Sequence, residues 1–532
     1  MARQSNMTVR DNVRLLIRKP RIFLVCATAA CGGLLFGYDL GVTGGVTGMT
    51  TFLEKFYPNV IHDQQLADSS AYCKFNDHML TLWTSSMFLA GAAASLVVLL
   101  LSNRMLMPGG GLGRRGVMIS GGIAFIIGAA LQAGAQNIAT LVLGRICLGV
   151  GIGFANEAVP PYISEMAPPS MRGALNILFQ LATTIGIFVA SLINWGVEGL
   201  EWGWRLSLGL ALVPAVIFTL GTIFCPDTPN SVLEHDPDNV AKATEVLTRF
   251  RPDGHDIQNE VLDIQRNAQE TRVETFWGSI STLYSRRHWK QASAALLIPF
   301  FQQFTGMNAI MFYAPQLYQV LGFGVKASLF NSVINNTVNL VATFGAIVAV
   351  DALGRKFLFL GAGSLMFVMQ IATGSIAAVH FKNGYIPPQV GAGMLTTICL
   401  FVAGFACSWG PLGWLVPSEI HTNQTRTAGM CGTVFINFIA SFIIGQFFNQ
   451  MLCSMQYGVF YFFAGWLAIM TMWVAFCLPE TKGIAVETVM DAWATVPNWP
   501  WKQKRVSRDL PETNPRITGA TNGAATNGNV KE

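Results

Sequence analysis

Long windows without a charged side chain recur along almost the whole sequence. Eight windows lack Asp, Glu, Lys and Arg: 79–103, 116–144, 173–197, 206–226, 291–325, 327–350, 357–381 and 383–418. Each could cross a hydrocarbon core of about 30 Å as a helix that rises about 1.5 Å per residue. A ninth window, 427–478, is interrupted by NQMLCSMQYG and predicts two helices. Two further apolar segments carry charge: 22–45 holds Asp39, and 138–161 holds Arg145 and Glu157. The pattern predicts an all-α polytopic membrane protein with twelve spanning helices.

The composition supports a membrane protein. The 532 residues are 52% hydrophobic and 12% charged, about half the charged share of a typical soluble domain. The net charge of +5 does not require a nucleic acid partner, because the basic residues lie in the connections between apolar segments. We expect membrane lipids to surround the chain instead.

The basic residues predict the orientation of the helices. Almost all of them lie on the side of the N-terminus. The opposite loops hold five: Lys55, Lys74, Arg205, Lys326 and Lys382. Because cytoplasmic loops carry the excess of Lys and Arg, we expect both termini in the cytoplasm.

Five regions follow from this topology. They are a cytoplasmic N-terminal arm (1–21), a six-helix bundle (22–226) with an extracellular lid loop at about 46–78, a cytoplasmic helical linker (227–290), a second six-helix bundle (291–480), and a cytoplasmic tail (481–532). The tail is rich in Asn, Thr, Gly and Pro, which predicts disorder. No cleavable signal sequence is evident.

The two halves repeat short motifs in the same order. Glu165 is followed seven residues later by Arg172, and Glu419 is followed seven residues later by Arg426. Further pairs are PDT at 226–228 with PET at 479–481, and GRR at 113–115 with GRK at 354–356. Two parallel six-helix repeats with a site at their interface are typical of secondary transporters. We expect the acids and arginines at the cytoplasmic ends to form a gate.

The chemistry of the second half favours a neutral, hydroxylated substrate. The sequence contains no G-x-x-x-x-G-K-[ST] loop for ATP and no Cys/His cluster with metal spacing, so a gradient would supply the energy. No Lys or Arg lies deep in a span of this half. Amide side chains, which both donate and accept hydrogen bonds, are abundant there. They are Gln302, Gln303, Asn308, Asn335, Asn336 and Asn339, with Gln180 in span five.

The setting of these amides suggests a cavity. Pro299, Gly306 and Pro315 share the apolar segment of Gln302 and Gln303, which favours a broken helix. Phe36, Trp409 and Trp414 could cover the apolar face of a sugar ring. The alternatives are contacts between helices for each amide and simple packing for each Trp, above all for Trp409.

Asp39 and Arg145 are the best candidates for proton coupling. Charged side chains within a span are costly, so they usually form pairs or line a path. A carboxylate can take up a proton, whereas arginine stays charged. We expect protonation of Asp39 to release Arg145. The alternative is a static salt bridge, and Glu157 is a weaker second candidate.

Cys73 and Cys453 are placed outside the cell by this topology, whereas the other eight cysteines lie in apolar spans. An oxidising exterior permits a disulfide between the two halves, which we expect. Two free thiols are the alternative.

Seven ordered motifs resemble the sugar porter family of the major facilitator superfamily, and within it plant and green-algal monosaccharide–proton symporters. They are GGLLFGYDLGVTGGV (32–46), GRICLGVGIG (144–153), PPYISEMAPPSMRG (160–173), QQFTGMNAI (302–310), DALGRK (351–356), SWGPLGWLVPSEI (408–420) and LPETKG (478–483). The resemblance covers about residues 22 to 483. It implies two six-helix bundles, a cytoplasmic helical domain between them, and no enzymatic activity.

The resemblance also implies roles for individual residues. Asp39 matches the proton donor and acceptor, and Arg145 its partner; Cys73 and Cys453 match a disulfide between an extracellular lid and the second half. Sugar-binding positions are matched by Gln180, Gln302, Gln303, Asn308, Asn339 and Trp414, with Phe36 and Leu40 as apolar neighbours. The cytoplasmic gate is matched by Glu165, Arg172, Glu419 and Arg426, to which we add Arg115 and Arg355.

Three departures from the family pattern stand out. The loop GGGLGRR lacks the usual acid before GRR, PDTPN replaces PESP after span six, and Ser441 stands where some relatives have an amide.

The expected function is proton-coupled import of a hexose, with glucose the first candidate, by a monomer in the plasma membrane. Protons are the coupling ion, and we expect no cofactor and no metal. A uniporter for hexose or pentose is the main alternative, and the acid at position 39 argues against it. A sugar sensor that does not transport is a further alternative.

Overall fold

The computed structural model describes residues 19–481, apart from short gaps at 66–70, 103–111, 169–170, 237, 253–255, 272–275, 286–287, 321–322, 381–386 and 422–424. Most of the arm (1–21) and of the tail (481–532) therefore lies outside the described residues, as do the glycines before Leu112 in GGGLGRR. Within the described residues, twelve helices are long and apolar enough to span a membrane, which confirms the predicted number.

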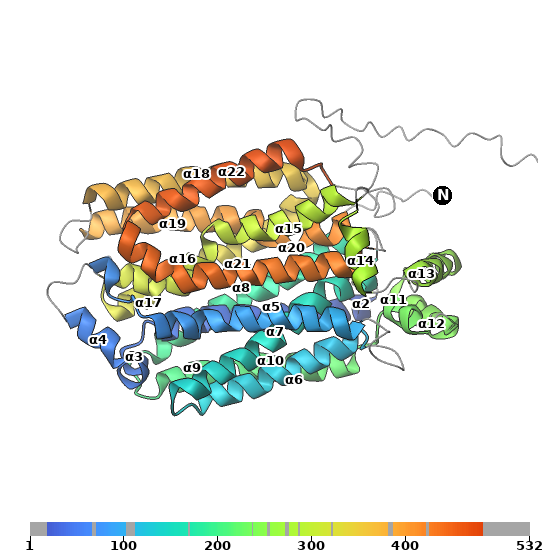
Figure 1. Ribbon diagram of the computed structural model, residues 1–532, viewed down its shortest axis with the longest axis horizontal. Coiled ribbons are helices and arrows are strands. Elements are labelled where there is room, and N and C mark those ends of the chain that lie inside the picture. Colours follow the sequence, from blue (N-terminus) through green and yellow to red (C-terminus); the bar gives the residue numbers. More distant parts are fainter. Residues whose placement is uncertain are drawn as a thin grey trace, which may run out of the picture.

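The spanning helices form two side-by-side bundles, with the first half of the chain at the bottom of Figure 1 and the second half at the top. The first half contains α2 (Pro20–Val46), α5 (His78–Ser102), α6 (Arg114–Ala133), α7 (Ile138–Met166), α8 (Arg172–Val197), α9 (Gly203–Gly209) and α10 (Leu212–Phe224). The second half contains α15 (Trp289–Phe304), α16 (Met307–Val320), α17 (Val325–Leu353), α18 (Arg355–His380), α19 (Pro388–Cys407), α20 (Trp409–Ile420), α21 (Arg426–Met455) and α22 (Gly458–Cys477).

Short helices cover the two ends of the bundles (Figure 1). At one end, here called the lid end, lie α3 (Thr50–Phe56), α4 (Pro58–Gln65) and the 3₁₀ helix η1 (Ala71–Cys73). At the other, here called the linker end, lie α11 (Pro229–His235), α12 (Val240–Phe250), α13 (Ile257–Thr271) and α14 (Phe276–Leu283). The lid region, expected as a loop, therefore contains helices.

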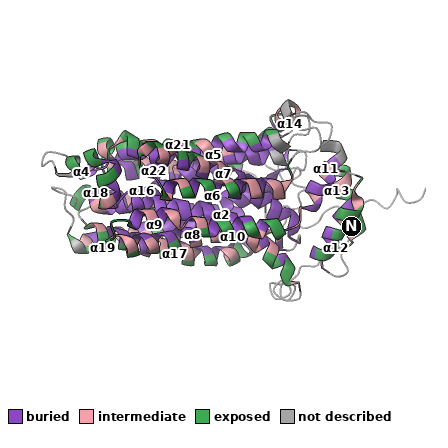
Figure 2. Cartoon of the chain, turned by 90° about the horizontal axis from the view of Figure 1, so that it is seen from below, coloured by how far each residue is buried: buried purple, intermediate pink, exposed green. Residues whose placement is uncertain are grey.

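The helices bury their polar side chains between them and leave apolar side chains outside. Figure 2 shows buried residues along the middle of the bundle and exposed ones on its flanks. Many of the exposed side chains are large and apolar, such as Phe224 and Val348, which are 85% and 70% exposed. A soluble protein rarely exposes so much apolar surface, whereas hydrocarbon favours it.

Three helix pairs make the largest contacts between the halves. Helix α5 packs against α21, α8 against α17, and α2 against α16. Each pair joins one helix of each half, so the space between the three pairs is the natural place for a substrate site.

Candidate functional site

A buried ion pair joins the first and fourth spanning helices. Nη1 of Arg145 on α7 donates to both oxygens of Asp39 on α2, at 2.9 and 2.8 Å. The Arg145 side chain is fully buried and that of Asp39 is 1% exposed. Asn137 caps the start of α7 by accepting from the backbone N–H of Thr140, which stabilises the first turn of the helix that carries Arg145. Low solvent access makes the pair sensitive to the loss of either charge.

Glycines let α2 approach α8 closely enough to bury Asp39 between helices. A Cβ on Gly37 would lie 1.9 Å from the backbone oxygen of Thr183, and one on Gly33 would lie 2.3 Å from that of Phe179. No side chain can be accommodated at such distances. The glycines around Asp39 therefore set the depth at which its carboxylate lies.

The predicted break in span seven is present. Gly306, with φ +83°, separates α15 from α16, and its Cα faces the ring of Phe463 at a distance that leaves no room for a Cβ. Gln302 and Gln303 therefore lie in the last turn of one helix and Asn308 in the first turn of the next. A second break, at Ser408 between α19 and α20, was not predicted. Broken helices expose polar backbone groups where these line a cavity.

Gln302 connects the two breaks. Its Nε2 donates to the backbone oxygens of Trp409 (2.9 Å) and Gly410 (3.1 Å), just past the Ser408 break. Its Oε1 accepts from Nδ2 of Asn437 on α21 at 2.8 Å. All polar atoms of this amide are thus held by the protein, which fixes its orientation.

A second group of polar side chains lies around Asn308. Its Nδ2 donates to Oε1 of Gln303, and Ser441 Oγ lies 3.4 Å away. Ser441 also donates to the backbone oxygen of Asn437, one turn earlier on α21. Ser441, which departs from the family pattern, therefore contacts a group of amide side chains. Gln302, Gln303, Asn308 and Asn437 are here called the amide cluster.

The first half reaches the same region. A Cβ on Gly410 would lie 3.3 Å from Nε2 of Gln180, so Gln180 on α8 approaches the backbone that Gln302 binds from the other half. Two aromatic contacts also join the halves: Phe179 with Trp414, with centroids 6.0 Å apart, and Phe36 with Phe438, 6.2 Å apart. Leu40 lies one turn after Phe36 and is also buried.

Three buried amide oxygens on the second-half helices α17 and α21 have no hydrogen-bond partner among the described residues. They are the Oδ1 atoms of Asn335 and Asn339 on α17 and of Asn437 on α21. Buried polar atoms are normally paired, so these three are free to accept from a bound hydroxyl. Trp409 is fully buried, and its ring lies 4.5 Å from that of Phe359.

The repeated motifs form matching networks at the linker end. Arg114 lies 3.7 Å from Glu165 in the first half, and Arg355 lies 3.0 Å from Glu419 in the second. Thr228 donates to Glu165, as Thr481 does to Glu419. These contacts stay within each half.

The acids of PDT and PET also occupy matching places. Asp227 accepts from the backbone N–H of Arg115 at 3.4 Å, and Glu480 accepts from those of Arg355 and Lys356 at 3.0 Å. Both carboxylates thus lie at the start of a helix, where the backbone dipole favours negative charge.

The remaining gate residues are placed less simply. Arg115 donates through Nη2 to the backbone oxygen of Ile223, so its neighbour Arg114 is the one close to Glu165. Arg172 begins α8 and Arg426 begins α21, but the side chain of Arg426 lies outside the described part of the chain.

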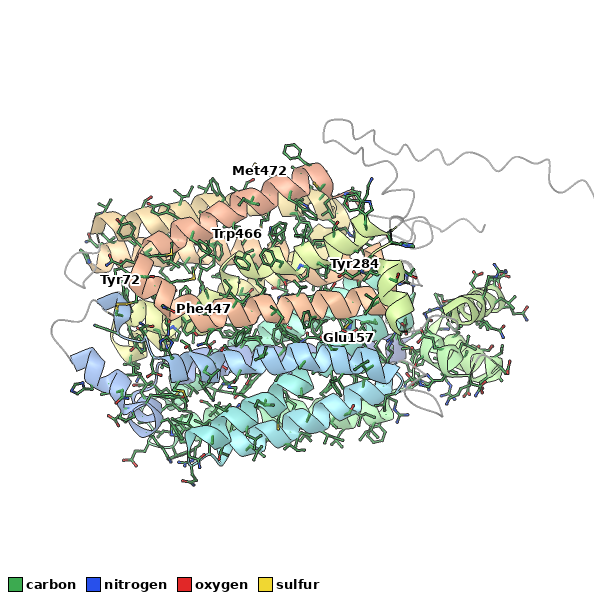
Figure 3. The ribbon with its side chains drawn as sticks, in the orientation of Figure 1. Tyr72, Glu157, Tyr284, Phe447, Trp466 and Met472 are labelled. Carbon is green, nitrogen blue, oxygen red and sulfur yellow. A yellow bond between two sulfur atoms is a disulfide. The ribbon has the colours of Figure 1, made fainter. Side chains whose placement is uncertain are left out.

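Glu157 does not share the Asp39–Arg145 site. It lies twelve residues after Arg145 on α7, toward the linker end in Figure 3, and is 3% exposed. Its Oε2 has no hydrogen-bond partner among the described residues.

Cys73 and Cys453 form the expected disulfide, which is confirmed. It joins η1 of the lid to α21 across a sequence separation of 380 residues. Nearby, Nδ2 of Asn449 donates to the backbone oxygen of Phe75 at 2.9 Å, so the lid is held to the second half by two kinds of bond. Among the described residues, no group of three or more His, Cys, Asp or Glu side chains lies together as a metal site would need.

Comparisons with known proteins identify the family of this chain. Residues 25–493 match the family described as "Sugar (and other) transporter". The chain belongs to this sugar transporter family. It is 48% identical over 485 residues to the H(+)/hexose cotransporter 2 of Parachlorella kessleri, covering 90% of this chain and 87% of that protein. It is 46% identical over 489 residues to the sugar transport protein MST3 of Oryza sativa, covering 91% and 92%.

Solved structures share the fold. The proton:xylose symporter XylE, a member of the major facilitator superfamily bound there to 6-bromo-6-deoxy-D-glucose, superposes with a TM-score of 0.74 at 23% identity, covering 89% of this chain and 99% of that one. This sugar transporter therefore has the major facilitator fold that its resemblance to the sugar porter family implied.

The sequence analysis did not identify Asn437 or Trp83. Asn437 lies four residues before Ser441, on the same face of α21, so helical spacing from a known candidate could have identified it. Trp83 contacts Arg145 and carried no signal in the sequence.

Proposed function

We propose that this protein is a proton-coupled monosaccharide symporter that imports a hexose, with glucose the first candidate, across the plasma membrane by alternating access. Membership of the sugar transporter family supports transport of a sugar. The observation that carries proton coupling is the buried pair of Asp39 and Arg145, because only the carboxylate can change its charge. The names of the relatives, a hexose cotransporter among them, agree with this choice.

The lid end faces the cell exterior in this proposal. The distribution of Lys and Arg supports this orientation, which places both termini in the cytoplasm. The Cys73–Cys453 disulfide also supports it, because such bonds persist in oxidising surroundings.

Sugar binds between the halves, at the amide cluster. Gln302, Gln303 and Asn308 line the break of span seven, and Gln180 reaches them from the first half. Asn339 and Asn437 offer free acceptor atoms, while Trp414, Phe36 and Leu40 supply apolar surface. Amides both donate and accept, so they suit hydroxyl groups that do the same.

Coupling follows from the electrostatics of the first half. Protonation of Asp39 from the lid side removes its charge, loosens its hold on Arg145 and lets the first half repack around bound sugar. Return of the empty carrier requires Asp39 to lose that proton on the linker side. Helices α7 and α20 contact each other across the halves, and the networks around Glu165 and Glu419 hold their linker ends. Separation of these two helices there opens the cytoplasmic gate.

The deciding experiment is the current evoked by glucose in voltage-clamped cells that express the protein, measured at two external pH values with tracer uptake in parallel. An inward current that grows as the external pH falls is expected. Tracer uptake without current would identify a uniporter, and neither current nor uptake would direct the search to other sugars.

A further inference from the structure

Arg145 contacts a second partner besides Asp39. Its guanidinium carbon lies 4.1 Å from the ring centroid of Trp83 on α5, which is well within the range of a cation–π interaction. Nη1 also lies 3.9 Å from the sulfur of Met87, one turn further along α5. One face of α5 therefore covers the guanidinium that Asp39 binds from α2.

The hydrogen bonds of Arg145 are unevenly distributed. Nη1 makes both bonds to Asp39, while Nε and Nη2 are buried without a hydrogen-bond partner among the described residues. When Asp39 is neutral, a fully buried cation is left without a charged partner, which is costly. The indole face of Trp83 then remains as a contact that specifically favours a cation.

Trp83 is held in place by the lid. Phe52 of α3 packs against it with a centroid distance of 5.0 Å, and Phe52 also contacts Tyr57 and Trp204, each at 5.8 Å. Trp83 and Phe52 are fully buried. The indole that supports Arg145 therefore belongs to an aromatic cluster that continues into α3.

Among the described residues, two tyrosines are the other titratable groups that interact with the pair. Tyr57, from the lid, interacts electrostatically with Arg145, and its buried hydroxyl has no partner among the described residues. Burial raises the pKa of Tyr57, and the carboxylate of Asp77 adds to this, so the hydroxyl stays neutral. Tyr38 adjoins Asp39 on α2 but donates its hydroxyl to the backbone oxygen of Ser207.

We propose that Trp83 is a positioning residue for proton coupling, whose ring face holds Arg145 in place while Asp39 is neutral. This rests on the proposed symport. A cation binds the ring more strongly when no carboxylate neutralises it, so the contact favours the protonated state of Asp39 over the ionised one. Without the ring, a higher external proton concentration should be required to protonate Asp39 to the same extent.

The test compares Trp83→Leu and Trp83→Phe with Trp204→Leu. Trp204 is a matched control, because it is buried in the same cluster and packs against Phe52. Its ring contacts the cations of Lys55 and Arg205, whereas that of Trp83 contacts Arg145. Sugar-evoked current is measured from pH 5 to 8, normalised to surface protein, with tracer uptake in parallel.

Trp83→Leu should shift the external pH of half-maximal current to lower pH by about half to one unit, which is the size of a cation–π interaction at 1.36 kcal/mol per unit. Trp83→Phe keeps an aromatic ring with a weaker cation–π interaction, so it should shift the midpoint by less in the same direction. It also serves as the test variant if Trp83→Leu does not fold. Trp204→Leu should scale the current without moving the midpoint.

Equal midpoints for wild type and both Trp83 variants would overturn the role of Trp83 and leave the proposed symport intact. A shift in Trp204→Leu as large as that in Trp83→Leu would do the same. A wild-type protein whose current does not depend on pH would overturn the proposed symport and this inference with it.

Discussion

Nη1 of Arg145 bonds to both carboxylate oxygens of Asp39, although 106 residues separate the two in the sequence. A single nitrogen thus carries the whole hydrogen-bonded contact between α7 and α2 at this point. A change in the charge of Asp39 therefore acts directly on the packing of two spanning helices.

Asp39→Asn is expected to abolish sugar-driven proton current while sugar exchange across the membrane remains measurable. The amide keeps the shape of the carboxylate and one acceptor for Arg145, but it cannot take up a proton. Current and counterflow of labelled sugar in the same cells would check this. Proton-driven accumulation that persists in Asp39→Asn would mean that the pair is a static salt bridge.

Glu157→Gln should leave the ratio of charge to sugar unchanged. Glu157 lies twelve residues, about 18 Å along the helix, from Arg145. The measurement is current divided by tracer uptake under voltage clamp, with wild type as reference. A ratio that falls by half would assign a second transported proton to Glu157.

Asn437→Ala should raise the KM for sugar by roughly two- to tenfold, since one hydrogen bond contributes about 0.5–1.5 kcal/mol and about 1.4 kcal/mol corresponds to tenfold. Asn437 fixes Oε1 of Gln302 and offers its own free Oδ1. Because the two side chains form one unit, the effects of Asn437→Ala and Gln302→Ala should not add in the double variant.

Asn449→Ala is the control for Asn437→Ala. It removes an amide from the same helix, twelve residues nearer the lid, where it binds the backbone oxygen of Phe75. It should lower thermal stability and leave the KM nearly unchanged. Additive effects of the variants at 302 and 437, or an equal change of KM in Asn449→Ala, would argue against the amide cluster as the sugar site.

Cys73→Ser, Cys453→Ser and the double variant should lose equal amounts of stability, because each breaks the same bond. The loss is expected to be about 2–4 kcal/mol, the usual contribution of a disulfide. Thermal unfolding of the purified protein in detergent would measure it. Reductant should lower the Tm of the wild type and leave that of the double variant unchanged, and a larger loss in the double variant would point to roles for the separate thiols.

Local patterns predicted much of the fold. Charge-free windows located the spanning helices, and Gly306 between the amides of span seven marked its break, because composition and glycine act within a few residues. The break at Ser408 was missed, since 383–418 reads as one uninterrupted apolar window. The lid helices α3 and α4 were missed because helices of seven or eight residues give too weak a hydrophobic periodicity.

Contacts between distant segments could not be predicted in the same way. The choice between Arg114 and Arg115 as the neighbour of Glu165 depends on the direction of each side chain from α6, which the letters GRR do not give. The contact of Trp83 with Arg145 joins α5 to α7, and no local periodicity encodes it.

The disulfide also has a mechanical consequence. It fixes the distance between the Cα atoms of Cys73 and Cys453 at 4.5 Å, near one tip of α21. Any rotation of one half against the other must therefore pivot close to this tether. Helix α21 has 30 residues and is about 45 Å long, so a turn of about 10° would sweep its other tip through roughly 8 Å. A small rotation about the disulfide at the lid end thus produces a large displacement of α21 at the linker end.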